Sequence, residues 1–213
     1  DIYKNRSNSS GMDITERQNL KALKANLKFY ETKMVNAVSV YEGRKNLNKA
    51  SEEVFSISSG QQIGNVVFDE QTQLKECLEN NCSNEWSDTK TEQRSEILNK
   101  IANDIEENPY ELIYYLINEA GKTIQNSIDE IREGVDFLRY YSYQILSLSK
   151  KVELSGPTGE ENIISYSPKG RFLCISPWNF PVAILIGQIS AALASGNNVM
   201  ICLLYTSDAA DEP

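Results

Sequence analysis

The chain has 213 residues, a formal net charge of −9 and 40% hydrophobic residues, a composition in the range of an ordinary globular protein. This acidic balance excludes nucleic-acid binding as a bulk property, so no nucleic-acid partner is expected from this segment. The absence of histidine from the sequence excludes Ser-His hydrolysis, histidine-bearing zinc sites and histidine general bases.

Cysteine usage and hydropathy narrow the class of protein further. The four cysteines form no Cys-x-x-Cys pattern, so we expect reduced thiols, no metal site and a cytoplasmic protein. Cys174 stands inside an apolar strand pattern and is expected to be a small buried residue. The longest apolar stretch, residues 180–194, contains Gln188 and Ser190, and it is too short and too polar for a transmembrane segment.

The first part of the chain is polar and interrupted by Asn, Ser and Gly. Residues 1–50 are therefore predicted to be a linker or edge segment, with one helical pattern around residues 20–38. The main domain is expected from residue 51 onward. Two short strands are predicted over 54–57 and 63–67, and a helix over 70–78.

Start and stop signals mark two helices in the middle of the chain. Residues 89–92, Thr-Lys-Thr-Glu, have the Thr-x-x-Glu pattern of a capping box, which predicts a helix start there with Trp86 in the preceding loop. Asn108 as N-cap and Pro109 as first residue predict the next helix, and Gly121 predicts its end.

A longer helix is predicted from a continuous apolar stripe with steps of four and three residues, which would face the core. The residues of the stripe are Ile124, Ile128, Ile131, Val135 and Leu138. Glu130, Arg132 and Glu133 are expected on the other faces of this helix.

The last part of the chain predicts a hairpin followed by a βαβ unit. Residues 156–159, Gly-Pro-Thr-Gly, predict the turn of a projecting hairpin at about 150–167, suited to pairing with another subunit. An apolar strand, the turn Pro-Trp-Asn-Phe-Pro, an apolar helix and a second strand over 198–201 then indicate an α/β fold with a parallel sheet. Residues 202–213 abandon this pattern, resemble a translated sequencing adapter and are expected to be an artefact.

Three blocks in the same order resemble motifs of the aldehyde dehydrogenase superfamily. They are residues 118–123 (NEAGKT), 177–181 (PWNFP) and 191–197 (AALASGN). More narrowly, residues 130–141 and 156–160 resemble the dehydrogenase half of the bifunctional proline utilisation proteins. The resemblance implies the N-terminal part of an aldehyde dehydrogenase fold: helical segments, the start of a parallel-sheet NAD-binding domain over 51–201, and an oligomerisation hairpin.

The same resemblance implies an activity. The parent protein would oxidise L-glutamate 5-semialdehyde, the open form of 1-pyrroline-5-carboxylate, to L-glutamate with NAD in proline catabolism. Its partners would be this small-molecule substrate and further copies of itself in a homo-oligomer. FAD would belong only to a proline dehydrogenase half, which these residues do not contain.

The resemblance also assigns roles within the Pro-Trp-Asn-Phe-Pro turn. Asn179 matches the side-chain amide that stabilises the oxyanion, a catalytic role. Phe180 would pack on the aliphatic part of the substrate, and Glu133 would attract its ammonium group. The residues of the NAD-binding edge would be Ile175, Ser176, Pro177 and Trp178.

One departure from the family pattern limits what this segment would do. Cys202 stands where the family has a lysine that contacts the adenosine ribose. The nucleophilic cysteine and the glutamate that activates water are expected downstream, so this piece alone would not turn over substrate. Two alternatives stay open: an aldehyde dehydrogenase for another semialdehyde, which would keep Asn179 without needing Glu133, and a noncatalytic scaffold with the same fold.

Overall fold

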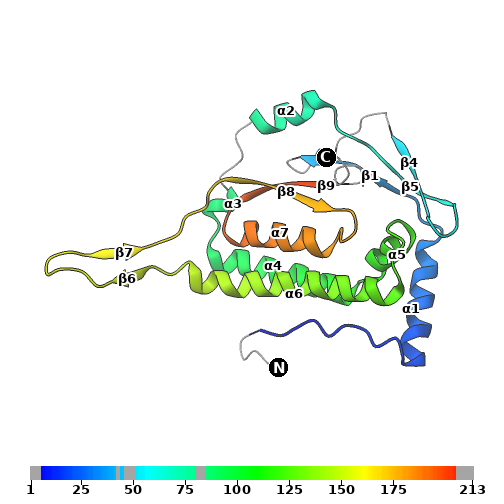
Figure 1. Cartoon of the computed structure of the whole chain (residues 1–213), viewed down its shortest axis with the longest axis horizontal. Coiled ribbons are helices and arrows are strands. Elements are labelled where there is room, and N and C mark those ends of the chain that lie inside the picture. The colour runs from blue at the N-terminus through cyan, green and yellow to red at the C-terminus, as the bar shows by residue number, and fades with distance from the viewer. Residues whose placement is uncertain (1–5, 42–43, 46–50, 80–84, 205–213) are drawn as a thin grey trace, which may run out of the picture. The chain divides into compact units, whose positions relative to one another are not determined.

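The structure is a computed structural model, and it describes residues 6–41, 44–45, 51–79 and 85–204. The chain divides into two compact units, whose elements are labelled in Figure 1. The mixed-sheet unit comprises Met12–Cys82 and Pro109–Ile128, and the βαβ unit comprises Asp1–Gly11, Ser83–Asn108 and Asp129–Pro213.

Within its described residues, the mixed-sheet unit contains two small sheets and the helices α1, α2 and α5, together with the start of α6. Their bounds are α1 (Arg17–Tyr30), β1 (Val35–Ala37), β2 (Val40–Tyr41), β3 (Arg44–Lys45), β4 (Glu52–Phe55), β5 (Gln62–Val66), α2 (Gln71–Glu79) and α5 (Tyr110–Asn118). In the larger sheet, β5 pairs in parallel with β1 and antiparallel with β4, while β2 and β3 pair with each other. The buried side chains of Leu23 and Ile113 lie on α1 and α5, which pack together.

The elements predicted in this unit are largely confirmed. The strands expected over 54–57 and 63–67 form as β4 and β5, shifted by two residues and one residue toward the N-terminus, and the helix over 70–78 forms as α2. Within residues 1–50, the helix ends at Tyr30 and β1 lies at one edge of the sheet. Gly64 permits this pairing, because a Cβ there would collide with the backbone oxygen of Val35.

The βαβ unit holds the remaining elements. Their bounds are α3 (Glu85–Asp88), α4 (Thr91–Glu107), most of α6 (Ile124–Leu148), β6 (Val152–Leu154), β7 (Asn162–Ile164), β8 (Arg171–Pro177), α7 (Ala183–Ala194) and β9 (Asn198–Leu204). β8 and β9 pair in parallel, so the predicted βαβ unit is confirmed. Figure 1 shows α7 between this strand pair and the helices α4 and α6.

The second strand of this pair is longer than predicted. β9 does not stop at Ile201, since Ile175 pairs with Cys202 and Pro177 pairs with Leu204. The strand pairing therefore continues for three residues into residues 202–213, the segment that the sequence predicts to be an artefact. Residues 205–213 lie outside the described residues.

A buried asparagine joins the amino ends of the two strands. Asn197 is 4% exposed, and its Oδ1 accepts hydrogen bonds from the backbone N–H of Lys169 and of Gly170 at 2.6 and 2.9 Å. Its Nδ2 donates to the backbone oxygen of Ala192 near the end of α7. The start of β8, the end of α7 and the start of β9 are thus tied by one side chain.

The apolar stripe of α6 is confirmed. Ile128, Ile131, Val135 and Leu138 are each less than 5% exposed. In α4, Leu98 and Ala102 are the buried apolar residues. The stripe was predictable because its spacing depends only on the period of the helix itself.

Two of the helix-start predictions are wrong in detail. The helix α4 begins at Thr91 with Lys90 as its N-cap and no side-chain capping bond, because the Thr89 hydroxyl donates instead to the backbone oxygen of Glu85. That bond belongs to the end of α3, so Trp86 lies in a short helix and not in a loop. Pro109 is the N-cap of α5, one residue later than predicted, and Gly121 follows the helix with a φ of 66°.

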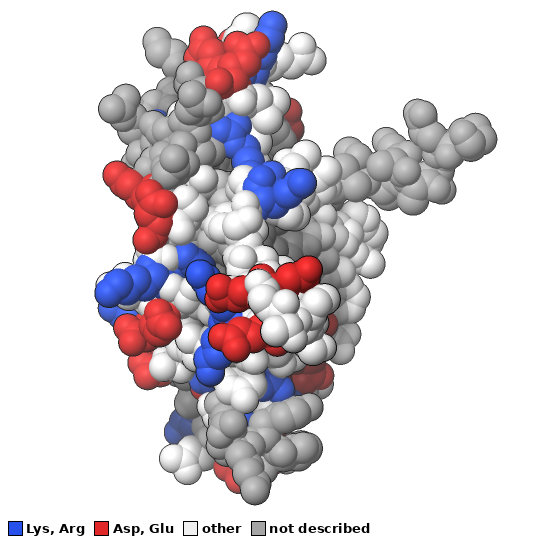
Figure 2. All heavy atoms as spheres, turned by 90° about the vertical axis from the view of Figure 1, so that its left-hand side faces the viewer, with Lys and Arg blue, Asp and Glu red and all other residues white. Residues whose placement is uncertain are grey.

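The predicted hairpin is confirmed as the antiparallel pair of β6 and β7, and it projects from the unit in Figure 1. Val152 and Leu154 on β6 are 50% and 47% exposed. Figure 2 shows basic and acidic side chains interspersed on one face, without a continuous basic surface among the described residues seen there. Of the helices in the described ranges, none is long and apolar enough to cross a membrane.

Candidate functional site

The candidate site is the turn that joins the carboxyl end of β8 to the start of α7. Asn179 lies in this turn, two residues after the strand ends, and it is exposed. Ser176 is fully buried below the turn, and its hydroxyl donates to the backbone oxygen of Phe180 at 3.4 Å. The strand therefore holds the turn through Ser176, while Asn179 is exposed to solvent. An exposed amide at this point can donate to an oxygen atom of a bound ligand.

The other end of the turn is held by a buried carboxylate. Glu130 of α6 is 2% exposed, and its Oε1 accepts hydrogen bonds from the backbone N–H groups of Val182 and Ala183 at 2.8 and 3.2 Å. Val182 is the N-cap of α7 and has no side-chain capping bond. A carboxylate from another helix therefore takes the role that a polar N-cap side chain usually has.

The sequence prediction placed Glu130 on a face of its helix other than the apolar stripe, and the structure shows that this side chain is nevertheless buried. The partners of Glu130 are 52 and 53 residues away, and no local period indicates them. One signal was present in the sequence: Ser127 and Gly134, three residues before and four after Glu130, are small, and both are buried. Small residues on one face allow a second helix to approach closely.

The C-terminal end of α7 is held by two donors. Trp86 Nε1 donates to the backbone oxygen of Leu193 at 3.0 Å, and Arg94 Nε donates to that of Ala194 at 3.1 Å. A carboxylate at the N-terminus and a guanidinium at the C-terminus both match the sign of the helix dipole. Burial lowers the pKa of Arg94 from its ordinary value, an effect that Glu92 opposes.

The four residues expected to form an NAD-binding edge occupy different environments. Ile175 and Trp178 are each 48% exposed, Pro177 is half-buried and Ser176 is buried. A groove of 560 Å³ runs along β8 beside α7, and Ile175 lines it. Gln188 of α7 donates to the backbone oxygen of Ile175 at 3.0 Å. The exposed side chains therefore form an apolar rim at the carboxyl half of the strand.

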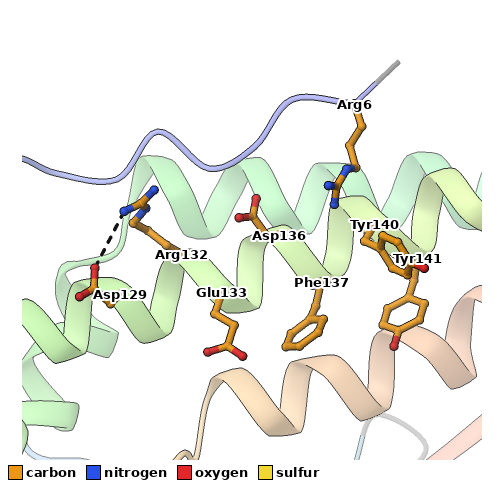
Figure 3. A pocket seen from close by; sticks show the side chains of 8 residues that line it. All are labelled: Arg6, Asp129, Arg132, Glu133, Asp136, Phe137, Tyr140 and Tyr141. Carbon is orange, nitrogen blue, oxygen red and sulfur yellow. Dashed lines mark ion pairs between the residues drawn. The ribbon is translucent and has the colours of Figure 1, made fainter. Parts of the chain in front are cut away.

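Glu133 lines a separate pocket of 470 Å³ on α6 (Figure 3). Figure 3 shows Glu133 and Phe137 directed toward the neighbouring helix, whereas Arg132 and Asp136 are directed toward the N-terminal segment. The rings of Phe137 and Tyr141 stack at 6.3 Å between centroids. The pocket thus combines three carboxylates, of Asp129, Glu133 and Asp136, and aromatic surface with the guanidinium groups of Arg6 and Arg132. Arg6 lies over the ring of Tyr140, so this pocket already holds one organic cation of the chain itself.

This pocket lies beside α7 because small residues bring the two helices together. A Cβ on Gly187 of α7 would lie 3.2 Å from the ring of Phe137, and a Cβ on Gly134 of α6 would lie 2.9 Å from Ile186. Glu130, Gly134 and Phe137 of α6 contact residues 182–183, 186 and 187 in turn, so the contacts follow the same order along both helices. Asn179, Phe180 and Glu133 are consequently placed on adjoining elements of one unit; Phe180 is 41% exposed.

Cys174 is confirmed as a buried residue, with 5% exposure, and burial raises the pKa of its thiol. A buried thiol with a raised pKa is a poor nucleophile. Among the described residues, no group of three or more His, Cys, Asp or Glu side chains is arranged to hold a metal ion.

The fold and this turn define an α/β protein with a parallel strand pair, the class in which ligands bind at the carboxyl ends of the strands. Residues 45–202 match the profile described as "Aldehyde dehydrogenase family". The chain belongs to the aldehyde dehydrogenase family, and the resemblance drawn from its three motifs is confirmed.

Relatives narrow the comparison within this family. Bifunctional protein PutA of Escherichia coli (strain K12) is 34% identical over 203 residues, which cover 94% of this chain and 14% of that protein. A 1-pyrroline-5-carboxylate dehydrogenase of Anoxybacillus flavithermus is 39% identical over 116 residues, 54% of this chain and 22% of that protein. The chain thus spans less than a quarter of the length of either relative.

Solved structures share the fold over most of the chain. A crystal structure of 1-pyrroline-5-carboxylate dehydrogenase from Thermus with bound NAD has a TM-score of 0.85 and 26% sequence identity. The match covers 94% of this chain and 40% of that one.

Proposed function

We propose that the chain is part of an NAD-dependent aldehyde dehydrogenase that oxidises L-glutamate 5-semialdehyde to L-glutamate in proline catabolism. The observation that carries the proposal is the exposed amide of Asn179 in the turn between β8 and α7. The names of the relatives, PutA and 1-pyrroline-5-carboxylate dehydrogenase, support the choice of substrate.

In this proposal Asn179 stabilises negative charge on the substrate oxygen. When a cysteine thiolate attacks the aldehyde carbon, the carbonyl oxygen gains a full negative charge, and a side-chain N–H already aimed at that oxygen lowers the barrier. Neither thiol described above is assigned this attack: Cys174 is buried, and Cys202 lies in β9 at the position of the family's lysine. The thiolate would come from a part of the full polypeptide that is not described.

NAD would be held along the edge of residues 175–178. The exposed side chains of Ile175 and Trp178 present apolar surface beside the end of a parallel strand, which fits the flat nicotinamide and its ribose. When bound, NAD supplies the acceptor for the hydride that leaves the substrate carbon. Ser176 would support this edge by holding the backbone of the turn through its hydrogen bond to the backbone oxygen of Phe180.

The substrate would lie between Phe180 and Glu133. The half-exposed ring of Phe180 would pack on the aliphatic chain of the semialdehyde, and the Glu133 carboxylate would attract its ammonium group. The rings of Phe137 and Tyr141 support this role, because aromatic faces attract a bound cation, whereas the ring of Tyr140 already has Arg6 over it.

The experiment that tests the function is the rate of NADH formation by the full polypeptide that carries these residues. Replacing Asn179 by Ala is expected to lower kcat about 10²- to 10³-fold, corresponding to about 3–4 kcal/mol of lost oxyanion stabilisation, with the protein still folded. Glu96→Ala, an exposed change on α4 of the same unit, is the control and should leave the rate unchanged. If the unchanged protein forms no NADH with any aldehyde, the noncatalytic scaffold is correct.

The assembly and the location of the protein belong to the same proposal. The β6–β7 hairpin, with apolar side chains exposed on both strands, would contact a second copy in a homo-oligomer. The location is proposed to be the cytoplasm, where the thiols would stay reduced.

A further inference from the structure

The turn that carries Asn179 is fixed at two points. On the strand side, Ser176 donates to the backbone oxygen of Phe180, the residue directly after Asn179. On the helix side, Glu130 accepts from the backbone N–H of Val182, three residues after Asn179. Both points follow Asn179 closely, and three residues span at most about 10 Å even when fully extended, so a shift of the start of α7 would be passed on to the backbone of Asn179.

The acceptor on the helix side of the turn is a side chain of α6, Glu130. The first N–H groups of a helix have no partner inside the helix, and they usually bond to a polar N-cap side chain. Val182 at the N-cap is apolar and makes no such bond. Glu130 provides the acceptor from outside and satisfies two successive N–H groups with one oxygen atom.

The anchor is rigid because Glu130 itself is packed. It is 2% exposed on the face of the helix that also buries Ser127 and Ile131, and the close approach of Gly134 to Ile186 one turn later holds the two helices together. A carboxylate buried in this way cannot exchange its backbone partners for water without moving α6 from α7.

We propose that Glu130 is a positioning residue for the oxyanion amide, and this inference rests on the proposed function. Glu130 touches neither substrate nor cofactor. Through Val182 and Ala183 it fixes where α7 begins, and through the short turn it fixes the backbone position from which the Asn179 amide reaches the oxyanion. A displacement of about 1 Å in such a donor is enough to cost about 10²-fold in rate.

The test compares three changes at one position in the full polypeptide. Glu130→Ala removes the acceptor, Glu130→Asp keeps the charge but is too short to reach both N–H groups, and Glu130→Gln keeps the reach but loses the charge. We expect kcat to fall about 10- to 100-fold for Ala and for Asp, and to stay within about threefold for Gln. KM for the semialdehyde should stay within about twofold, because an oxyanion bond forms only in the transition state. Glu96→Ala on α4 is the matched control.

A double-mutant cycle separates positioning from a general loss of structure. If Glu130 acts through Asn179, the change Glu130→Ala should lower kcat by less than about twofold once Asn179 is already Ala. Effects that multiply in the double variant would overturn the proposal. An Asp variant as active as the unchanged protein would also overturn it, because reach would then not matter.

Hydrogen exchange supplies a readout that does not depend on activity. The amides of Val182 and Ala183 should exchange at least about tenfold faster in the Asp variant than in the Gln variant, whether or not the Ala variant folds. Equal exchange in these two variants would overturn the anchor itself. Faster exchange in a protein that oxidises no aldehyde would support the anchor while refuting the proposed function.

Discussion

Two glutamates three residues apart on α6 have opposite environments. Glu130 is 2% exposed and bonds to the backbone at the start of α7, whereas Glu133 is exposed and lines the pocket of Figure 3. A helical turn of 3.6 residues explains the difference, because a step of three residues moves the side chain by about 60° around the axis. One carboxylate is therefore part of the scaffold, and the other is available to a ligand.

This availability leads to a prediction about substrate choice. Glu133→Ala in the full polypeptide should raise KM for L-glutamate 5-semialdehyde about tenfold, since a hydrogen bond between charged groups contributes about 1.5 kcal/mol. KM for succinate semialdehyde, which has no ammonium group, should change by less than about twofold. Steady-state rates of NADH formation with both aldehydes measure the difference. An equal change for the two aldehydes would favour an aldehyde dehydrogenase for another semialdehyde.

At the residue scale, the sequence indicated some roles and missed others. Asn179 could be predicted to lie in an exposed turn because prolines flank it between two apolar segments. The buried position of Cys174 followed from its apolar neighbours. Glu130 could not be assigned, because its two backbone partners are brought to it only when α6 and α7 pack.

At the scale of elements, the prediction succeeded where a signal was local. The stripe of α6, the β6–β7 hairpin and the βαβ order depend on periods and turns that a short window contains. The capping box failed because the Thr89 hydroxyl has a nearer acceptor, the backbone oxygen of Glu85 in α3. The short helix α3 precedes the motif and takes up the hydroxyl of Thr89. The sequence around Trp86 did not predict this helix.

The hairpin allows a prediction about assembly. Val152 pairs with Ile164 across the two strands, and both side chains are exposed on the same face of the ribbon. An isolated two-stranded ribbon is marginally stable, so this apolar face is expected to be covered by a second copy. Changing both residues to Lys should lower the mass measured by light scattering during gel filtration to that of a smaller assembly.

The matched control for this experiment lies on the opposite face of the same ribbon. Glu153 pairs with Ile163 there, and Glu153→Lys should leave the mass unchanged. An unaltered mass for the double Lys variant would contradict the role of the hairpin.

At the scale of the whole molecule, acid stability is tied to one ion pair in the βαβ unit. Arg139 Nη2 lies 2.6 Å from Glu106 Oε2, and the Glu106 Oε1 accepts from the backbone N–H of Ser10 at 2.7 Å. Burial raises the pKa of Glu106, but the hydrogen bonds from Arg139 and Ser10 outweigh it, and the net pKa lies below the ordinary value.

A depressed pKa in the folded state stabilises the protein above the pKa of the unfolded state, about 4.3 for Glu, and this stabilisation is lost as the pH falls through the folded value. Glu106→Gln should therefore lower the free energy of unfolding by about 1–2 kcal/mol at pH 7. The difference from the unchanged protein should shrink as the pH falls below about 4.3 and vanish below the pKa of Glu106 in the folded protein. Urea unfolding at several pH values measures it, and a difference independent of pH would refute the assignment.

The amide of Asn197 has a consequence for which changes of chain length the strand pair can tolerate. It holds the parallel register where β8 and β9 begin, at the end of the strands opposite Asn179. An insertion at residues 168–170 would displace the two N–H groups that Asn197 binds and shift β8 against β9, whereas a substitution around residues 178–182 leaves that register unchanged. Pairing errors and changes of chemistry therefore arise at opposite ends of one strand pair.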